Sequence, residues 1–567
     1  GPEGVDDGPR IRTVPRPAEE LDTLEKRLME IRVDRSGLID IPVIETEAEE
    51  TDGSVPVVKS AWTPLLDELT LRISARGPIS VSEFMTVALG HPIHGYYMRK
   101  DVFGEQGDFT TSPEISQVFG ELIGVWCVAN WMALGQPSRI RLFELGPGRG
   151  TLMADLLRAA SSFPAFAQAL ERGGGVRMIE TSPALRSFQQ QTLRCTKEDG
   201  TPVIQYWPVQ APPVFRSKPK SGEAGAETLS TDKDIPATVH QDEEWEAARL
   251  AGRIRMRAPL RVGRSGIPPA VPAQWFRDFR EALANDTETG AGDVPILAVA
   301  QELFDALPIH QFELAKSGRW VERMVDIDPA PETIGAADRE FGPNETVDKR
   351  HHLRFVLSRG ATPASKIFLS QNEQTRDNPD ARPGDSIEVG AVGAGLIQDL
   401  VREISTVGGA SLIIDYGENE PGSNSLRGIK EHQFVHPLLE PGFVDLSADV
   451  DFGFLKGVAE RMGKELGPKT NESFQVLGPI TQGEFLRNMG IETRVAMLLQ
   501  KAASPEDQET IYTAFKRLVD PETFDKEGNM VAGMGQSYKV MALFAGLPGT
   551  PAHAIGEIDF AGFPQGR

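Results

Sequence analysis

Apolar strands alternate with amphipathic helices along the chain from about residue 139 onward. Helical patterns begin at Thr151 and Pro183, each directly after a strand. Uninterrupted apolar strands separated by amphipathic helices are typical of a sheet that is covered on both faces. The sequence therefore predicts an α/β fold with a mostly parallel sheet. Its strands are expected at "RIRLFEL" (139–145), "GVRMIE" (175–180), "PILAVAQEL" (295–303) and "ASLIIDYG" (410–417).

Composition divides the rest of the chain into segments around this α/β region. With 567 residues, the chain is long enough for two or three domains with substantial cores. One stretch in its middle is rich in Pro, Gly, Ser and charged residues, and such a composition buries little surface. The predicted segments are a disordered tail (1–58), an N-terminal helical region (59–135), an α/β domain (136–545) with a disordered insertion (208–268) and an extra β-rich excursion (319–395), and a C-terminal tail (546–567).

Charge and cysteine content exclude several classes of protein. The formal net charge is -23, from 82 acidic and 59 basic residues, whereas proteins that bind nucleic acid cluster Lys and Arg. We therefore expect no nucleic-acid partner and consider a basic protein segment or a cationic ligand a better fit. Two cysteines, Cys127 and Cys195, cannot build a disulfide framework, and no CxxC or HExxH motif occurs. No metal site is expected.

Neither a membrane nor a compartment can be read directly from the sequence. No segment approaches the roughly 18 consecutive apolar residues that a transmembrane helix needs, so we expect no membrane span. The opening Gly1-Pro2 is typical of a protease scar, and any native targeting peptide is then missing from this sequence.

A glycine-rich turn, "ELGPGRGTL", joins the first strand to its helix. Its glycines are Gly146, Gly148 and Gly150, so Thr151 stands where a dinucleotide fingerprint needs its third glycine, and no P-loop Gly-Lys-Ser/Thr follows. Glu144 would repel a pyrophosphate but attract an ammonium or a sulfonium. The pattern resembles the S-adenosylmethionine loop of class I methyltransferases, which assigns Glu144, Pro147 and the three glycines to the cofactor. A turn that binds nothing is the alternative.

Glu180 ends the second strand, 30 residues after Gly150. A carboxylate at the end of this strand can accept hydrogen bonds from both hydroxyls of a ribose. The alternative is an exposed acid at a strand end. Together with the glycine loop, Glu180 favours a cofactor that contains a nucleoside.

Several motifs in a fixed order resemble the MidA family, the mitochondrial complex I assembly factor group of arginine methyltransferases. The resemblance covers about residues 60–545 without the insertion. It is carried by "HPIHGYYM" (91–98), "GDFTTSPEISQVFGELIG" (107–124), "ELGPGRGTL" (144–152), "QELFDALP" (301–308), "LIIDYG" (412–417) and "SLRGIKEHQFVHPLLEPGFVDLSADVDF" (425–452).

This resemblance implies a class I methyltransferase (Rossmann-like) fold with added helical and β-rich elements, and S-adenosyl-L-methionine as the cofactor. It further implies a protein substrate, namely a core subunit of respiratory complex I that is symmetrically dimethylated on an arginine during assembly. The implied location is the mitochondrial matrix. The degree of methylation and a possible homodimer stay open at this point.

Two acids follow the third strand in "QELFDALP". An arginine guanidinium stays protonated in proteins, so a methyltransferase has to orient it, and carboxylates can do so through bidentate hydrogen bonds. Glu302 and Asp305 should emerge at the carboxyl end of the sheet, where α/β folds bind ligands. We predict both as catalytic and assign Gln301 to the cofactor site. The alternative is that the acids only satisfy backbone N–H groups at a helix start.

The segment "GDFTTSPEIS" is predicted to form a lid over the cofactor within the N-terminal helical region. Thr110, Thr111 and Ser112 offer hydroxyl groups, and the free amides of the helix after Ser112 would suit the methionine carboxylate of the cofactor. Ser112 is the expected N-cap, with Pro113 in the first helical position. A plain helix cap without a ligand is the alternative.

Two histidines and three aromatic residues complete the candidates. His432 and His436 follow "LIIDYG" and are predicted to shape the substrate channel or accept a proton near neutral pH, although a structural histidine is the commoner outcome. Tyr96, Tyr97 and Trp275 are candidates for stacking on adenine or lining the pocket, with ordinary packing as the alternative.

Two other functions compete with the arginine methyltransferase. The chain could be a complex I assembly chaperone that binds S-adenosylmethionine without essential catalysis, or it could methylate a small molecule. Replacing Glu302 and Asp305 while retaining cofactor binding distinguishes the chaperone from the methyltransferase, because a pure chaperone should still support assembly of complex I.

Overall fold

The computed structural model describes residues 61–99, 111–193, 195–198, 201–205, 254–257, 271–328, 352–369, 381–420, 422–431, 433–466, 473–524, 530–550 and 560–564. The predicted tail at 1–58 lies outside these residues. So does the predicted insertion at 208–268, except for strand β6 (Ile254–Arg257).

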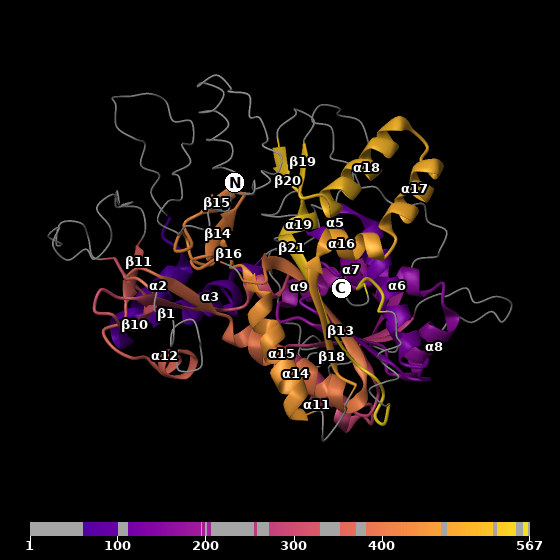
Figure 1. The fold of residues 1–567 in the computed structure, drawn as a ribbon, viewed down its shortest axis with the longest axis horizontal. Helices are drawn as coiled ribbons and strands as arrows, with labels where there is room; N and C mark the ends of the chain where they lie inside the picture. Colours follow the sequence, from indigo (N-terminus) through magenta and orange to yellow (C-terminus); the bar gives the residue numbers. More distant parts are fainter. Residues whose placement is uncertain are drawn as a thin grey trace, which may run out of the picture.

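A central sheet of 11 strands forms the middle of the molecule (Figure 1). Five neighbouring strands run parallel, and β21 lies antiparallel to β13. The predicted α/β fold with a mostly parallel sheet is confirmed. Along the sheet the order is β18 (Gln475–Thr481), β21 (Tyr538–Ala545), β13 (Gly409–Glu418), β8 (Ile296–Gln301), β2 (Arg141–Leu145), β3 (Val176–Ile179), β7 (Pro272–Phe276), β6, β5 (Thr201–Gln205) and β4 (Cys195–Glu198), with β17 (Val450–Asp451) beside β13.

Helices cover both faces of this sheet. Apolar side chains of each strand point alternately to the two faces, so that Leu142 packs in one hydrophobic cluster and Phe143 in another. One face carries α6 (Gln117–Ala133), α7 (Thr151–Ala160), α8 (Pro164–Arg172) and α9 (Pro183–Thr192). The other face carries α11 (Phe279–Glu288), α14 (Ala391–Val407) and α15 (Phe452–Leu466), the last two side by side in Figure 1.

The helix expected to start at Ser112 is divided in two. Thr111 is the N-cap of the short helix α5 (Ser112–Ile115), and Thr111 N donates a hydrogen bond of 3.2 Å to the Glu114 carboxylate. Ser112 is thus the first helical residue, and its predicted role as N-cap is wrong. The cap lies one residue earlier because Thr111 forms a capping box with Glu114. The helix is divided because Ser116 is extended (φ -153°, ψ 131°) and caps α6 separately.

A second sheet and the first helices pack together beside the central sheet (Figure 1). Three strands of this second sheet, β10, β11 and β12, fall within the range of the predicted β-rich excursion (319–395). The domain boundaries themselves stay predictions. The elements are α2 (Pro64–Arg76), β1 (Ile79–Ser80), α3 (Val81–Gly90), α4 (Tyr96–Arg99), β9 (His310–Leu314), β10 (Trp320–Ile327), β11 (Leu353–Leu357), α12 (Pro363–Phe368) and β12 (Ser386–Val389). A sheet of three short strands is formed by β14 (Arg427–Lys430), β15 (Gln433–Val435) and β16 (Asp445–Ser447).

A helical segment lies between β18 and β21 near the end of the chain. It places helices next to α5 and α6, so residues more than 350 positions apart become neighbours. Within the described part of the chain, no helix is both long and apolar enough to cross a membrane. The elements are α16 (Gln482–Asn488), α17 (Ile491–Lys501), α18 (Pro505–Val519), β19 (Glu522–Phe524), β20 (Met530–Ala532) and α19 (Met534–Ser537).

Candidate functional site

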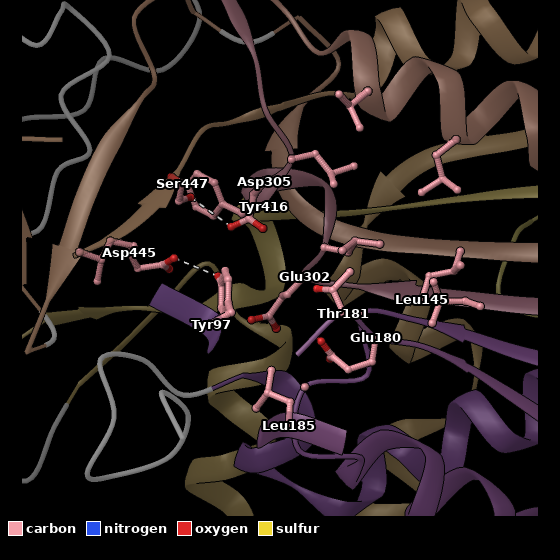
Figure 2. Close-up of a pocket in the computed structure, with 18 of the residues that line it drawn as sticks. Tyr97, Leu145, Glu180, Thr181, Leu185, Glu302, Asp305, Tyr416, Asp445 and Ser447 are labelled. Carbon is pink, nitrogen blue, oxygen red and sulfur yellow. Dashed lines mark hydrogen bonds between the residues drawn. The ribbon is translucent and has the colours of Figure 1, made fainter. Parts of the chain in front are cut away.

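A cavity of about 890 Å³ lies at the carboxyl ends of the parallel strands (Figure 2). Leu145 at the end of β2, Ile179 at the end of β3 and Glu302 after β8 all line it. The opposite wall comes from β14, β16 and the segment from α18 to β21. The carboxyl edge of a parallel sheet is where α/β folds bind ligands, so this cavity is the candidate site.

The glycine-rich turn forms part of the cavity wall. The backbone φ is 66° at Gly146, 51° at Gly148 and 78° at Gly150, in the left-handed region that favours glycine. A Cβ on Gly146 would lie 2.8 Å from Leu303 Cδ1. Gly150 N donates to Pro147 O (2.7 Å) and closes the turn. Gly146 and Gly148 line the cavity. Pro147 and Gly150 are not among the residues that line it and instead close the turn.

Glu180 is buried at the carboxyl end of β3 and lines the cavity. Its carboxylate accepts hydrogen bonds from Ser182 N (2.7 Å) and from Gln189 Nε2 (3.2 Å). Burial raises its pKa to about 7, against the opposing effect of these hydrogen bonds. An acid that loses hydration in this way retains capacity to accept hydrogen bonds from a ligand's hydroxyl groups.

Gln189 is a positioning residue that the sequence did not reveal. This fully buried side chain of α9 donates from Nε2 to Gly148 O (2.8 Å) and to Glu180, and its Oε1 accepts from Trp275 Nε1 (2.7 Å). Gln189 thereby ties the glycine turn to the carboxylate at the end of the next strand. Trp275 is accordingly held in a packing role and is not among the described residues that line the cavity.

Glu302 directly follows β8, and its backbone has a positive φ of 51°. Such a conformation is uncommon outside glycine and marks a site where the surroundings fix the chain. Its carboxylate accepts hydrogen bonds from Ser112 N (3.0 Å) and Ser112 Oγ (3.3 Å), and also from Gln301 Nε2. Burial raises the pKa of Glu302 to about 8, and the negative charge of Asp305 adds to the rise.

Asp305 lies one turn further along the same wall and belongs to a hydrogen-bonded chain. Ser447 Oγ donates to Asp305 (3.0 Å) and accepts from Arg427 Nη2 (3.1 Å). Burial raises the pKa of Asp305, and Arg427 partly offsets that rise. Asp415, which the sequence did not single out, accepts from Leu303 N (3.0 Å) and so fixes the turn that carries both acids.

Tyr97 comes from the N-terminal region and closes the cavity on another side. Its hydroxyl donates to Asp445 Oδ1 (2.9 Å), as Figure 2 shows, and Ser182 Oγ donates to its carbonyl oxygen (2.7 Å). The neighbouring Tyr96 is buried in the apolar core. The motif that contains both tyrosines therefore joins the N-terminal helices to the cavity wall.

Glu144 does not line the cavity. It points to the face of β2 that packs on α6, where its charge acts on Cys127. Burial and the nearby charge of Glu180 raise the pKa of Glu144 well above its usual value, and its Oε2 accepts no hydrogen bond from the described residues. The described cavity lining therefore does not include this carboxylate, although the charge of the cavity-lining Glu180 acts on it.

Several other predicted site residues do not line the cavity or lie outside the described residues. Thr111, Ser112 and Gln301 are described but are not among the residues that line it. His436 Nδ1 accepts a hydrogen bond from Leu438 N (3.2 Å), and its ring packs 5.9 Å from the ring of Phe355; it is not part of the described cavity lining. His432 and Thr110 lie outside the residues that the structure describes. Across the described ranges, no group of three or more His, Cys, Asp or Glu is arranged to hold a metal ion.

The cavity residues fit S-adenosylmethionine. Gly146 and Gly148 present backbone without side chains to the cavity, and Glu180 offers a buried acceptor for the ribose hydroxyls. Two buried acids, Glu180 and Asp415, and two half-buried acids, Glu302 and Asp305, line or adjoin the cavity. The pKa of each is raised, and such a site favours a cationic ligand. Comparison with known proteins decides between this and other cationic ligands.

Residues 122–468 match the family described as "putative S-adenosyl-L-methionine-dependent methyltransferase". The chain belongs to this family. The membership confirms the cofactor predicted from the glycine turn, and it agrees with the fold class.

Similar proteins extend over most of the chain. Proteins named "Protein arginine methyltransferase NDUFAF7, mitochondrial" are 32% identical in Xenopus laevis (86% of this chain and 86% of that protein), 34% in Rattus norvegicus (85% and 87%) and 32% in Homo sapiens (87% and 88%). These relatives confirm the resemblance drawn from the motifs. A Burkholderia thailandensis protein, crystallised bound to S-adenosyl-homocysteine, shares the fold with a TM-score of 0.54 at 19% identity, covering 88% of this chain and 98% of that one.

Proposed function

We propose that this methyltransferase transfers methyl groups from S-adenosylmethionine to an arginine side chain of a protein. One observation carries the proposal: Glu302 and Asp305 line the same cavity as Gly146, Gly148 and Glu180. The cofactor residues and a pair of acids that suits a guanidinium thus share one space. The names of the relatives support the same substrate class.

The acids would bind and orient the guanidinium, which remains protonated at neutral pH. When bound, S-adenosylmethionine supplies a methyl group on a positively charged sulfur, and the sulfur keeps the bonding electron pair as a neutral thioether. Glu302 and Asp305 would hold one guanidinium nitrogen in position for attack on that methyl carbon. The nitrogen loses a proton as the new bond forms. Glu302 is assigned as its acceptor: its pKa of about 8 belongs to the empty cavity, a bound guanidinium favours the ionised carboxylate, and a carboxylate with a pKa near neutral is an effective base.

We further propose that the substrate is a core subunit of respiratory complex I and that its arginine is symmetrically dimethylated in the mitochondrial matrix. The motif resemblance implies this target, and the relatives are named mitochondrial. The net charge of -23 suits a basic substrate segment.

The test is a methylation assay with labelled S-adenosylmethionine and purified complex I core subunits, followed by mass spectrometry of the modified residue. Wild-type protein should label arginine, and Glu302→Gln should bind the cofactor without labelling. Assembly of complex I that is restored equally by the inactive variant would contradict an essential reaction and favour the assembly chaperone. Labelling of small molecules alone would contradict the protein substrate.

A further inference from the structure

Four arginines line the cavity, although its acids make it suited to cations. An arginine that lines a ligand cavity is available to an anion only if no acid of the protein already occupies it. Three of the four are held in ion pairs: Arg277 with Glu281 (3.5 Å), Arg280 with Asp399 (2.6 Å) and Arg427 with Asp449 (2.5 Å).

The fourth, Arg517 of α18, differs from these. It is half-buried, and it forms no ion pair or hydrogen bond with any side chain in the described ranges. Burial lowers its pKa, partly offset by the nearby Tyr538 and Glu302. A half-buried guanidinium without a partner has lost hydration without gaining a counter-ion, which is unfavourable unless a ligand supplies one.

Hydrogen bonds of neighbouring residues place Arg517 near Ser112 at one corner of the cavity. Its neighbour Leu518 accepts a hydrogen bond through its carbonyl oxygen from Gln482 Nε2 (3.0 Å), and Gln482 Oε1 accepts from Ser112 Oγ (3.4 Å). Ser112 in turn donates to Glu302. The end of helix α18 therefore lies close to the start of helix α5 and to the carboxyl end of β8.

The same corner lacks the anion donor that the sequence suggested. The amides of the helix after Ser112 are predicted to suit the methionine carboxylate, but Glu114 N and Ile115 N donate to Thr111 O (2.9 Å and 3.1 Å). Ser112 N itself donates to Glu302 (3.0 Å). The helix that begins there has only four residues. A carboxylate entering the cavity would meet Glu180, Glu302 and Asp305, which repel it, so it needs a cation that is not already paired.

We propose that Arg517 binds the carboxylate of the methionine part of S-adenosylmethionine. Guanidinium and carboxylate form two parallel hydrogen bonds, which would fix the orientation of the amino-acid end of the cofactor. Glu302 and Asp305 then remain available to the guanidinium of the substrate. The inference rests on the proposed function only in that the cavity takes this cofactor, and it holds whatever side chain is methylated.

Titration calorimetry with two ligands tests the assignment. S-adenosylmethionine and its decarboxylated analogue differ only in the carboxylate. In Arg517→Gln, affinity for S-adenosylmethionine should fall about 10- to 100-fold, whereas affinity for the analogue should be unchanged or higher. Arg517→Lys keeps the positive charge but cannot form the two parallel hydrogen bonds of a guanidinium. Its affinity for S-adenosylmethionine should lie between those of Arg517→Gln and wild type.

Arg280→Gln is the matched control, because Arg280 also lines the cavity but is paired with Asp399. It should leave the ratio of the two affinities as in wild type. Equal losses for both ligands in Arg517→Gln would assign Arg517 a structural role and overturn the proposal, as would no loss for either. Failure of arginine methylation would contradict the proposed function without changing this ratio, so the two failures are distinguishable.

Discussion

Charged side chains lie within the protein at both ends of the central sheet, but the acid at the amino end is held in ion pairs, whereas four acids around the cavity at the carboxyl end form none with the described Lys and Arg residues. At the amino end, Arg141 and Arg177 share the buried Asp286, with Nη to Oδ distances of 2.9 Å and 2.6 Å. Arg141 also donates to Glu403 (2.6 Å) and to Val294 O (2.9 Å). Positive and negative charges are balanced, and every one of these contacts is internal to the protein.

At the carboxyl end, four buried or half-buried acids lie around the cavity without such partners. Glu180, Glu302, Asp305 and Asp415 form no ion pair with any Lys or Arg in the described ranges, and burial raises the pKa of each. Balanced buried charge stabilises a fold without needing a ligand, whereas unbalanced buried charge is stabilised when a cation binds. The contrast distinguishes a structural cluster from a binding site within one sheet.

The largest expected effect belongs to the cavity end. Glu302→Gln should lower the rate of methyl transfer by about 100- to 1000-fold, because the guanidinium loses a charged partner and its proton loses an acceptor. Affinity for S-adenosylmethionine should change little, since Glu180 and the glycine turn are intact. Single-turnover rates and calorimetric titration measure the two quantities on the same preparation.

A matched control is Glu388→Gln. Glu388 is a half-buried acid with a raised pKa that does not line the cavity. Equal rate losses in both variants would show that burying an acid, and not its place in the cavity, explains the effect.

At the amino end, Asp286→Asn should act on stability instead. The substitution leaves Arg141 and Arg177 buried near each other with one fewer negative charge, and breaking such a pair costs on the order of 3–5 kcal/mol in the free energy of unfolding. Urea unfolding measures this loss. The folded fraction should bind S-adenosylmethionine like wild type, and a loss of affinity larger than the loss of stability would contradict a purely structural cluster.

This contrast was only half visible in the sequence. Glu180 and Glu302 could be predicted because each follows an apolar strand, and the carboxyl ends of parallel strands meet at one edge. The glycine turn was readable because its backbone needs positive φ at fixed spacing. Local patterns of this kind carry both the fold class and the cofactor-binding edge.

The partners of these residues could not be predicted, because they depend on contacts between distant segments. Ser112 and Gln482 are 370 positions apart, and Arg177 and Asp286 are 109 apart. A lone Arg or Gln in a helix gives no periodic signal of what it will face. Glu144 is a different case: its place beside the glycine turn predicts a ligand contact, the described cavity lining does not include it, and its role stays a prediction.

A smaller effect is expected for the nucleoside part of the cavity. Glu180→Gln should weaken binding of S-adenosylmethionine by about 10- to 100-fold, because an amide accepts fewer hydrogen bonds from the ribose than a carboxylate does. Titration calorimetry with S-adenosylmethionine and, separately, with NADH measures the change and the choice of cofactor. Unchanged affinity would remove Glu180 from the site, and tight NADH binding would contradict the reading of the glycine turn.

The smallest effect is a pH dependence that only the cavity end should produce. The pKa values of about 8 for Glu302 and about 7 for Glu180 exceed 4.5, so the folded protein without ligand binds more protons than the unfolded chain between these limits. These acids therefore lower the free energy of unfolding as pH rises from about 5 to 8. Glu302→Gln should flatten this decline by about 1–2 kcal/mol over the interval, less than the full linkage value because water can enter the cavity. Urea unfolding at both pH values, with wild type as reference, measures it. A decline as steep in Glu302→Gln as in wild type would mean that Glu302 is already ionised without a cation, and that the cavity end is balanced by a group other than a ligand.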